Sequence, residues 1–313
     1  MISHKIAFSR TVQLIKKYIA HERKLISRVF AIVLIKNLVI LPVPFLIQML
    51  VNDYLSLNVD GPLIAISILI FLLLLLSYSL DNCSVYLAEL LKRDLFVRNF
   101  FKIFRVLGAQ GGRVVNTDQV PRFLEVSGAK NDLSSVLKYV SHACIVVIFG
   151  TVIISSYHPF FLIYSILLIL SVGLILSFLY PKALLFKSIV SDSKYKANER
   201  LMQCSRMDTQ IDIEPSFNSI SLRYVKFRSK FFAIIIKKKF YIAALVAFAQ
   251  GLFIFLSGKL IFSEVLSIGQ FVAAEIVLTY ILASIVGITA SLEEWINVIV
   301  SLDKLDSVIM KKV

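Results

Sequence analysis

Apolar residues gather in six long blocks, and polar, basic stretches separate these blocks. A helix needs roughly 20 predominantly apolar residues to cross a bilayer, and each block approaches or exceeds that length. The first block is the least regular, because it contains Lys36, Asn37, Pro42 and Pro44, although buried transmembrane helices tolerate proline. The pattern therefore predicts six transmembrane helices, at about residues 30–52, 62–82, 139–157, 160–180, 240–258 and 268–290.

The composition supports a membrane protein. Of the 313 residues, 58% are hydrophobic and only 17% are charged, and the mean hydropathy is +0.82. A surface that faces water throughout does not allow these values. The net charge of +14 would suggest nucleic acid as the partner of a soluble protein, but here the basic residues follow the predicted spans. We therefore expect membrane lipids as partners and no nucleic acid.

The basic residues lie almost entirely on one side of the predicted spans. The other side carries Lys259 alone, and Lys36 lies within the first span. This asymmetry is the positive-inside pattern, so we expect both termini in the cytoplasm and residues 52–61 outside. The cytoplasmic side then holds 32 of the 34 Lys and Arg residues, in segments 1–29, 92–138, 182–239 and 304–312.

The two long inner connections read as helical hairpins. Residues 84–107 continue the pattern of the second span without Gly or Pro, and at about 1.5 Å per residue they would extend it some 35 Å beyond the lipid. Turn-forming residues interrupt the helical patterns at 108–121 and 207–218. The sequence thus predicts an all-α polytopic membrane protein whose six helices have cytoplasmic extensions, with inner hairpins near 84–138 and 182–239.

Residues 1–29 are basic and partly amphipathic. We expect them to form a lead-in helix along the inner membrane surface, ahead of one transmembrane domain over residues 30–313. The basic run of Lys237, Lys238 and Lys239 is expected to anchor the fifth span to phosphates of the inner leaflet.

Three polar side chains within the spans are candidates for a translocation pathway. An ionisable group at membrane depth usually faces a polar cavity or a partner, which makes Glu275 the first candidate. Gln48 and Gln250 could line the same pathway, or they could hydrogen-bond between helices. Glu275 could equally reach water or pair with a neighbouring helix. Lys36 is expected to extend its amine to the headgroups at the inner surface.

We expect no catalytic site and no metal site in this chain. The three cysteines form no CxxC pair, and no HExxH or nucleophile-elbow motif occurs. The four histidines are far apart and lack the spacing of metal ligands: His4, His21, His142 and His158.

Local sequence resembles the transmembrane domain of ATP-binding-cassette (ABC) exporters. Residues 44–55, PFLIQMLVNDYL, look like the end of that family's first span. NTDQVPRF at 116–123 resembles its Thr-Gly-Asp-x-x-x-Arg stretch, with Thr117 in place of the glycine and with Asp118 and Arg122 matching. The entry into span six, LSIGQFVAAEIVLTYIL, and the exit helix, SLEEWINVIVSLDKLDSVI, are also similar to the family.

The resemblance implies a function for the two hairpin tips. Exporters of this family use such tips as coupling elements that seat in grooves on two ATPase domains, and a solvated loop is the alternative interpretation. The candidate coupling residues are Arg113, Asn116, Asp118, Asp208, Gln210, Asp212 and Glu214.

The chain lacks the family's ATP-binding motif. No GxxxxGK[ST] sequence is present, so the chain has neither the backbone cradle for phosphates nor the lysine that contacts them. We expect this chain not to be an enzyme alone and to bind no cofactor. ATP and Mg are expected on a partner ATPase, which is either a separate subunit or part of a longer fused protein.

The resemblance implies the membrane-spanning permease subunit of an exporter in the bacterial inner membrane, dimeric with itself or a similar permease. The segment IGQFVAAEIV is nearest to exporters that work with a periplasmic adaptor, which favours peptide or protein cargo. Lipid or drug export by the same family is the alternative. A six-span channel or ion-driven carrier and a membrane scaffold are rivals of other classes.

Overall fold

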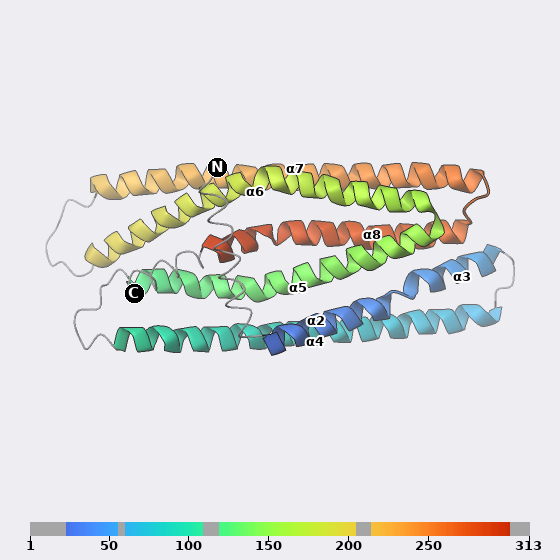
Figure 1. Cartoon of the computed structure of the whole chain (residues 1–313), viewed down its shortest axis with the longest axis horizontal. Coiled ribbons are helices and arrows are strands. Elements are labelled where there is room, and N and C mark those ends of the chain that lie inside the picture. Colours follow the sequence, from blue (N-terminus) through green and yellow to red (C-terminus); the bar gives the residue numbers. More distant parts are fainter. Residues whose placement is uncertain (1–22, 56–59, 109–118, 205–213, 301–313) are drawn as a thin grey trace.

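The computed structural model describes residues 23–55, 60–108, 119–204 and 214–300, and within these ranges it is helical with no strand (Figure 1). The predicted all-α fold is therefore confirmed. A further helical stretch follows the last labelled helix at 292–300. The helices are α2 (Arg23–Ile40), α3 (Val43–Leu55), α4 (Asp60–Gly108), α5 (Gln119–Tyr157), α6 (Pro159–Cys204), α7 (Glu214–Phe262) and α8 (Ile268–Ala290).

All six predicted spans are present. Six helical stretches among the described residues are long and apolar enough to cross a membrane, and each corresponds to one predicted window. Four of the helices that contain them are much longer than the predicted spans, since α4, α5, α6 and α7 continue into the hairpins. These helices support an integral membrane protein. Residues 1–22 of the predicted lead-in lie outside the described residues.

The first span is two helices rather than one. α2 ends at Ile40, a turn covers Leu41 and Pro42, and α3 begins at Val43. Pro42 and Pro44 have no backbone N–H to donate to the preceding turn, so the helical hydrogen bonds are interrupted there. The helical hydrogen bonds resume at Leu46, whose N–H donates to the carbonyl of Pro42 at 3.0 Å.

The long helices form two hairpins that turn at the same end of the molecule. α4 ends and α5 begins at that end, and so do α6 and α7 (Figure 1). The helix ends at Gly108 and Cys204 and the restarts at Gln119 and Glu214 agree with the predicted breaks. α4 has 49 residues, about 74 Å at 1.5 Å per residue, against a hydrocarbon core of about 30 Å.

Prolines at the helix starts fit this arrangement. Pro121, Pro159 and Pro215 each lie in the first turn of a helix, where backbone N–H groups have no partner within the helix. Pro181 is different, because it lies halfway along the 46 residues of α6. A proline there removes one helical hydrogen bond and bends the helix, and Figure 1 shows α6 changing direction near its middle.

The helices pack as three pairs. α6 lies against α7, α5 against α8, and α2 against α4. The pair α5 and α8 lies between the other two pairs (Figure 1). The largest buried cluster joins α5, α6, α7 and α8, with Phe161, Phe253 and Leu278 fully buried and the rings of Phe161 and Phe253 5.0 Å apart.

Two glycines let α8 approach its neighbours closely. A Cβ at Gly150 of α5 would lie 2.7 Å from Cγ1 of Ile281 on α8. A Cβ at Gly269 of α8 would lie 2.3 Å from Oδ1 of Asn52 and 2.8 Å from the backbone carbonyl oxygen of Gln48 on α3. Small residues at such contacts allow the backbones of transmembrane helices to pack closely, so these two positions fix α8 against α5 and α3.

Candidate functional site

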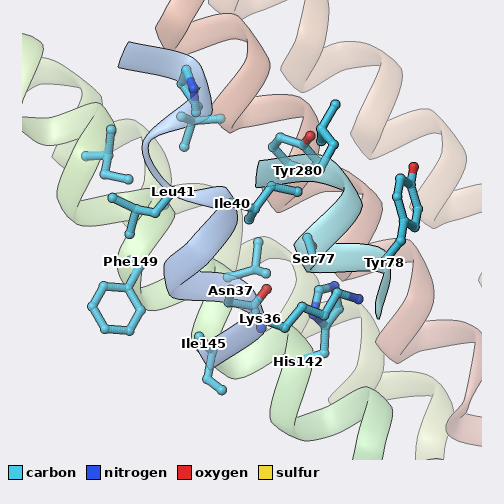
Figure 2. Close-up of a pocket in the computed structure, with 16 residues that line it drawn as sticks. Lys36, Asn37, Ile40, Leu41, Ser77, Tyr78, His142, Ile145, Phe149 and Tyr280 are labelled. Carbon is cyan, nitrogen blue, oxygen red and sulfur yellow. The ribbon is translucent and has the colours of Figure 1, made fainter. Parts of the chain in front are cut away.

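A cavity of about 260 Å³ lies among α2, α3, α4, α5 and α8 (Figure 2). It is just smaller than the range of about 300–1,000 Å³ that is usual for small-molecule sites. Its walls are mostly apolar, and its polar side chains come from several different helices. The lining residues include Lys36, Asn37, Ile40, Leu41, Ser77, Tyr78, His142, Ile145, Phe149, Gly150, Val277 and Tyr280.

Three charged side chains meet beside this cavity. Nζ of Lys36 lies 2.7 Å from Oδ1 of Asp81, and Nζ of Lys138 lies 3.3 Å from the same oxygen. Nζ of Lys138 also donates to Oδ2 of Asp81 at 3.5 Å. The three side chains are between 18% and 33% exposed, so water screens the pairs only partly. One carboxylate thus ties together α2, α4 and α5.

The local sequence of α4 explains why Asp81 lies at this position. Ser77, Asp81 and Ser84 recur at helical spacing and share one face, and Ser77 and Ser84 are buried. The hydroxyl of Ser84 donates to the carbonyl of Asp81 at 2.7 Å. Small hydroxyl side chains on this face let α2 and α5 approach closely enough for their lysines to reach the carboxylate.

Two more polar side chains lie at the same end of the cavity. Figure 2 shows Asn37 and His142 close to Lys36. Asn37 is buried, and its Nδ2 donates to the carbonyl of Val33 at 2.7 Å. Nδ1 of His142 is buried and has no hydrogen-bond partner among the described residues. A buried polar atom without a partner is costly, so a ligand or water that bonds to it would be favoured.

The predicted pathway residues are only partly brought together. Nε2 of Gln250 on α7 donates to Oε1 of Glu275 on α8, while Oε2 of Glu275 is buried without a partner among the described residues. Gln48 instead accepts a hydrogen bond from the hydroxyl of Tyr157 at 2.9 Å. Glu275 and both glutamines are absent from the cavity lining, and their role in a pathway stays a prediction.

Most of the predicted coupling residues lie outside the described residues: Arg113, Asn116, Asp118, Asp208, Gln210 and Asp212. Glu214 is the first residue of α7. α4, α5, α6 and α7 all have an end on the same side of the molecule (Figure 1), and in the sequence the other six candidates fall between these helix ends.

One lysine assignment was wrong and one stays a prediction. Lys36 pairs with Asp81 of α4, and the extension of its amine to the headgroups stays a prediction. Lys238 was expected at lipid phosphates, but it is only 2% exposed and its Nζ donates to the carbonyl of Thr289 at 2.5 Å. Thr289 lies in the last turn of α8, where carbonyls lack partners and favour a cation.

The sequence contained one signal for the cluster that was missed. Asp81 falls inside the predicted second span and Lys36 inside the first, and opposite charges at membrane depth tend to pair.

Within the described residues, no group of three His, Cys, Asp or Glu side chains could hold a metal ion. Comparisons with known protein families and with characterised proteins found no family model and no protein that matches this chain.

Proposed function

We propose that this chain is the membrane-spanning permease subunit of an ATP-driven exporter of the ABC type. It works as a dimer and couples to ATPase subunits or domains through its two cytoplasmic hairpin tips. The observation that carries the proposal is the pair of long helical hairpins that project from one side of the six spans (Figure 1).

The hairpin helices have the properties of levers that leave the lipid. α4 carries Glu89 with Lys92 and Arg93, whose nitrogen atoms lie 3.7 and 3.5 Å from its carboxylate oxygens. Such exposed pairs at helical spacing suit a helix in water or headgroups rather than in hydrocarbon. α6 and α7 continue in the same way beyond their apolar windows, with 46 and 49 residues.

A rigid hairpin can carry motion from an ATPase to the spans. When ATP draws two ATPase domains together, helices that are seated on those domains move as rigid bodies. ATP then favours one of two pre-existing arrangements of the spans by binding it more tightly. In this mechanism one arrangement opens to the cytoplasm and the other opens to the outside, with both termini and the basic residues on the cytoplasmic side of a bacterial inner membrane.

The resemblance of segment 268–277 to adaptor-dependent exporters supports peptide or protein as the first candidate cargo. A channel or ion-driven carrier would need a continuous polar route or broken helices at the centre of the membrane. Among the described residues, the first span is the one that is interrupted, at Leu41–Pro42. The charged side chains of Lys36, Asp81 and Lys138 pair with one another and do not form a continuous polar route.

Purification from the native membrane tests this function. The tagged full chain, extracted in a mild detergent, should retain a protein that hydrolyses ATP with Mg²⁺. Reversal of charge by Asp118→Lys and Asp212→Lys together should lower the recovered ATPase activity by at least about tenfold, if each lost charged contact contributes on the order of 1.5 kcal/mol. Glu264→Lys is the matched control, because Glu264 lies in the turn between α7 and α8, at the opposite end of the molecule from the end where α4 and α6 stop.

The contrary result is equally concrete. A preparation that contains no ATPase, and that conducts ions in a planar bilayer without ATP, would favour the channel. Full ATPase recovery by the doubly reversed variant would remove the assignment of the tips as coupling elements.

A further inference from the structure

We propose that the cavity among α2, α3, α4, α5 and α8 binds an anionic amphiphile, a molecule with one short apolar chain and a singly charged anionic head. The head would lie at Lys36, and the chain would lie along the apolar wall. The inference goes beyond the export function and does not depend on it, because it uses only the cavity and the charges beside it.

The charges beside the cavity do not balance. Lys36 and Lys138 share the single carboxylate of Asp81, and no acidic side chain lines the cavity. Among the described residues, the cluster therefore has a surplus of one positive charge. The three side chains are only 18–33% exposed, so water screens the surplus charge only partly, and this favours an anionic ligand over a neutral or a cationic one.

The arrangement also allows exchange of partners. Lys36 lines the cavity, whereas Lys138 does not. Lys36 can turn its ammonium towards a ligand while Lys138 keeps Asp81 neutralised at 3.3 Å. A simple Lys–Asp pair could not do this, because its lysine would leave the carboxylate without a counter-charge. The second lysine therefore makes the first one available.

The other lining residues fit the two parts of such a ligand. At the polar end, Nδ1 of His142 is buried without a partner among the described residues, and Asn37 lies beside it (Figure 2). Ile40 and Leu41 lie farther from Lys36 along the cavity wall, where they would contact the apolar chain of the ligand (Figure 2). The volume of 260 Å³ is suited to a head and a short chain rather than to a lipid with two acyl chains.

Head-group selectivity is the first test. The purified full chain in nanodiscs of zwitterionic lipid is titrated at pH 7.5 with decyl sulfate, decanol or decyltrimethylammonium, which share one chain and differ in charge. Empty nanodiscs give the partitioning baseline. Decyl sulfate should bind at least about tenfold more tightly than decanol, and decyltrimethylammonium should bind no better than the baseline. Equal binding of all three would overturn the proposal.

Three substitutions test the exchange of partners by the sign of their effects. Lys36→Gln should abolish the preference for decyl sulfate. Lys138→Gln should weaken binding about tenfold although Lys138 does not line the cavity, because Lys36 must then neutralise Asp81. Asp81→Asn should strengthen binding about tenfold, because both lysines lose their competing partner. Lys226→Gln, at an exposed position of α7, is the matched control and should change nothing.

Damage to the fold is distinguishable from this pattern, because it would weaken binding in every variant. Weaker binding by Asp81→Asn protein that keeps a cooperative thermal transition would contradict the exchange. If Asp81→Asn protein does not fold, Lys138→Gln decides alone, and unchanged binding by it would be the contradicting result.

The source of the ligand is identified by extraction. Protein purified from native membranes is extracted with organic solvent and analysed by mass spectrometry, beside the Lys36→Gln variant. A single-chain anionic lipid retained by the wild type and lost from the variant would support a membrane source. An empty extract together with selective binding of decyl sulfate would support delivery from the aqueous side. Retention of the same neutral lipid by both proteins would overturn the proposal.

Discussion

Two polar clusters lie within the spans, and they differ in what surrounds them. The Lys36–Asp81–Lys138 cluster joins α2, α4 and α5 beside a cavity, and it carries two positive charges and one negative charge. The Glu275–Gln250 pair joins α7 and α8 among packed apolar side chains and does not line that cavity. The comparison shows that free space and a surplus charge, and not an ionisable side chain alone, distinguish the first cluster from the second.

The largest loss of stability is expected at Gly269, where α8 packs against α3. α8 carries Glu275 of the second cluster and also lines the cavity beside the first cluster. Gly269→Val should destabilise the protein by about 3 kcal/mol, because overpacking against a fixed neighbour costs this much and the added Cβ would meet Asn52 and the backbone of Gln48. Thermal unfolding in detergent measures it. Gly251→Ala is the control, because a Cβ there would meet no atom within 4 Å. Equal stability of the two variants would show that α3 and α8 do not meet at Gly269.

Removing the carboxylate of the charged cluster should have the next largest effect. Asp81→Asn should cost about 2 kcal/mol without ligand, between the value for buried pairs and that for exposed pairs, because two lysines then face each other. The loss should shrink when decyl sulfate is added, as seen in the thermal transition. A variant as stable as the wild type without ligand would contradict the ion pairing.

A smaller effect is expected at the wall of the cavity. Gly150→Ala should cost about 1 kcal/mol, since the added methyl meets the side chain of Ile281, which can shift. It should also weaken the binding of decyl sulfate, because Gly150 lines the cavity. Thermal unfolding and the nanodisc titration measure the two effects. Loss of stability with unchanged binding would separate the helix contact from the cavity.

The smallest effect is expected at the second cluster. Glu275→Gln should change the stability by less than about 0.5 kcal/mol, because the amide oxygen of glutamine can still accept the hydrogen bond of Gln250, and an uncharged amide nitrogen replaces the unpartnered carboxylate oxygen Oε2. Denaturant unfolding of both proteins is the measurement. A loss as large as that of Asp81→Asn would mean that the two clusters are equivalent, and the comparison would fail.

The spans and breaks could be predicted because they depend on local chemistry. Apolar runs long enough for a bilayer gave the six spans, and turn-forming residues gave the breaks after Gly108 and Cys204. The interruption at Leu41–Pro42 follows from the missing N–H groups of proline, although the sequence alone was interpreted as one continuous span.

The cluster and the cavity could not be predicted in the same way. Lys36 and Asp81 are 45 residues apart, and Lys138 is 57 residues from Asp81, so their meeting depends on how three helices are rotated against one another. Lys238 shows the same limit. The basic residues next to it in the sequence suggested a contact with lipid phosphates. Its hydrogen bond to the carbonyl of Thr289 depends instead on how α7 packs against the last turn of α8.

The central claim is that both helical hairpins project into the cytoplasm, and labelling of single cysteines tests it most directly. In a background where Cys83, Cys144 and Cys204 are replaced, Ser56→Cys, Arg113→Cys and Asp212→Cys are treated separately with a membrane-impermeant maleimide in spheroplasts. Ser56→Cys should react in intact spheroplasts, and the other two should react only after permeabilisation. Reaction of Arg113→Cys or Asp212→Cys in intact spheroplasts would contradict the orientation and, with it, the proposed coupling to a cytoplasmic ATPase.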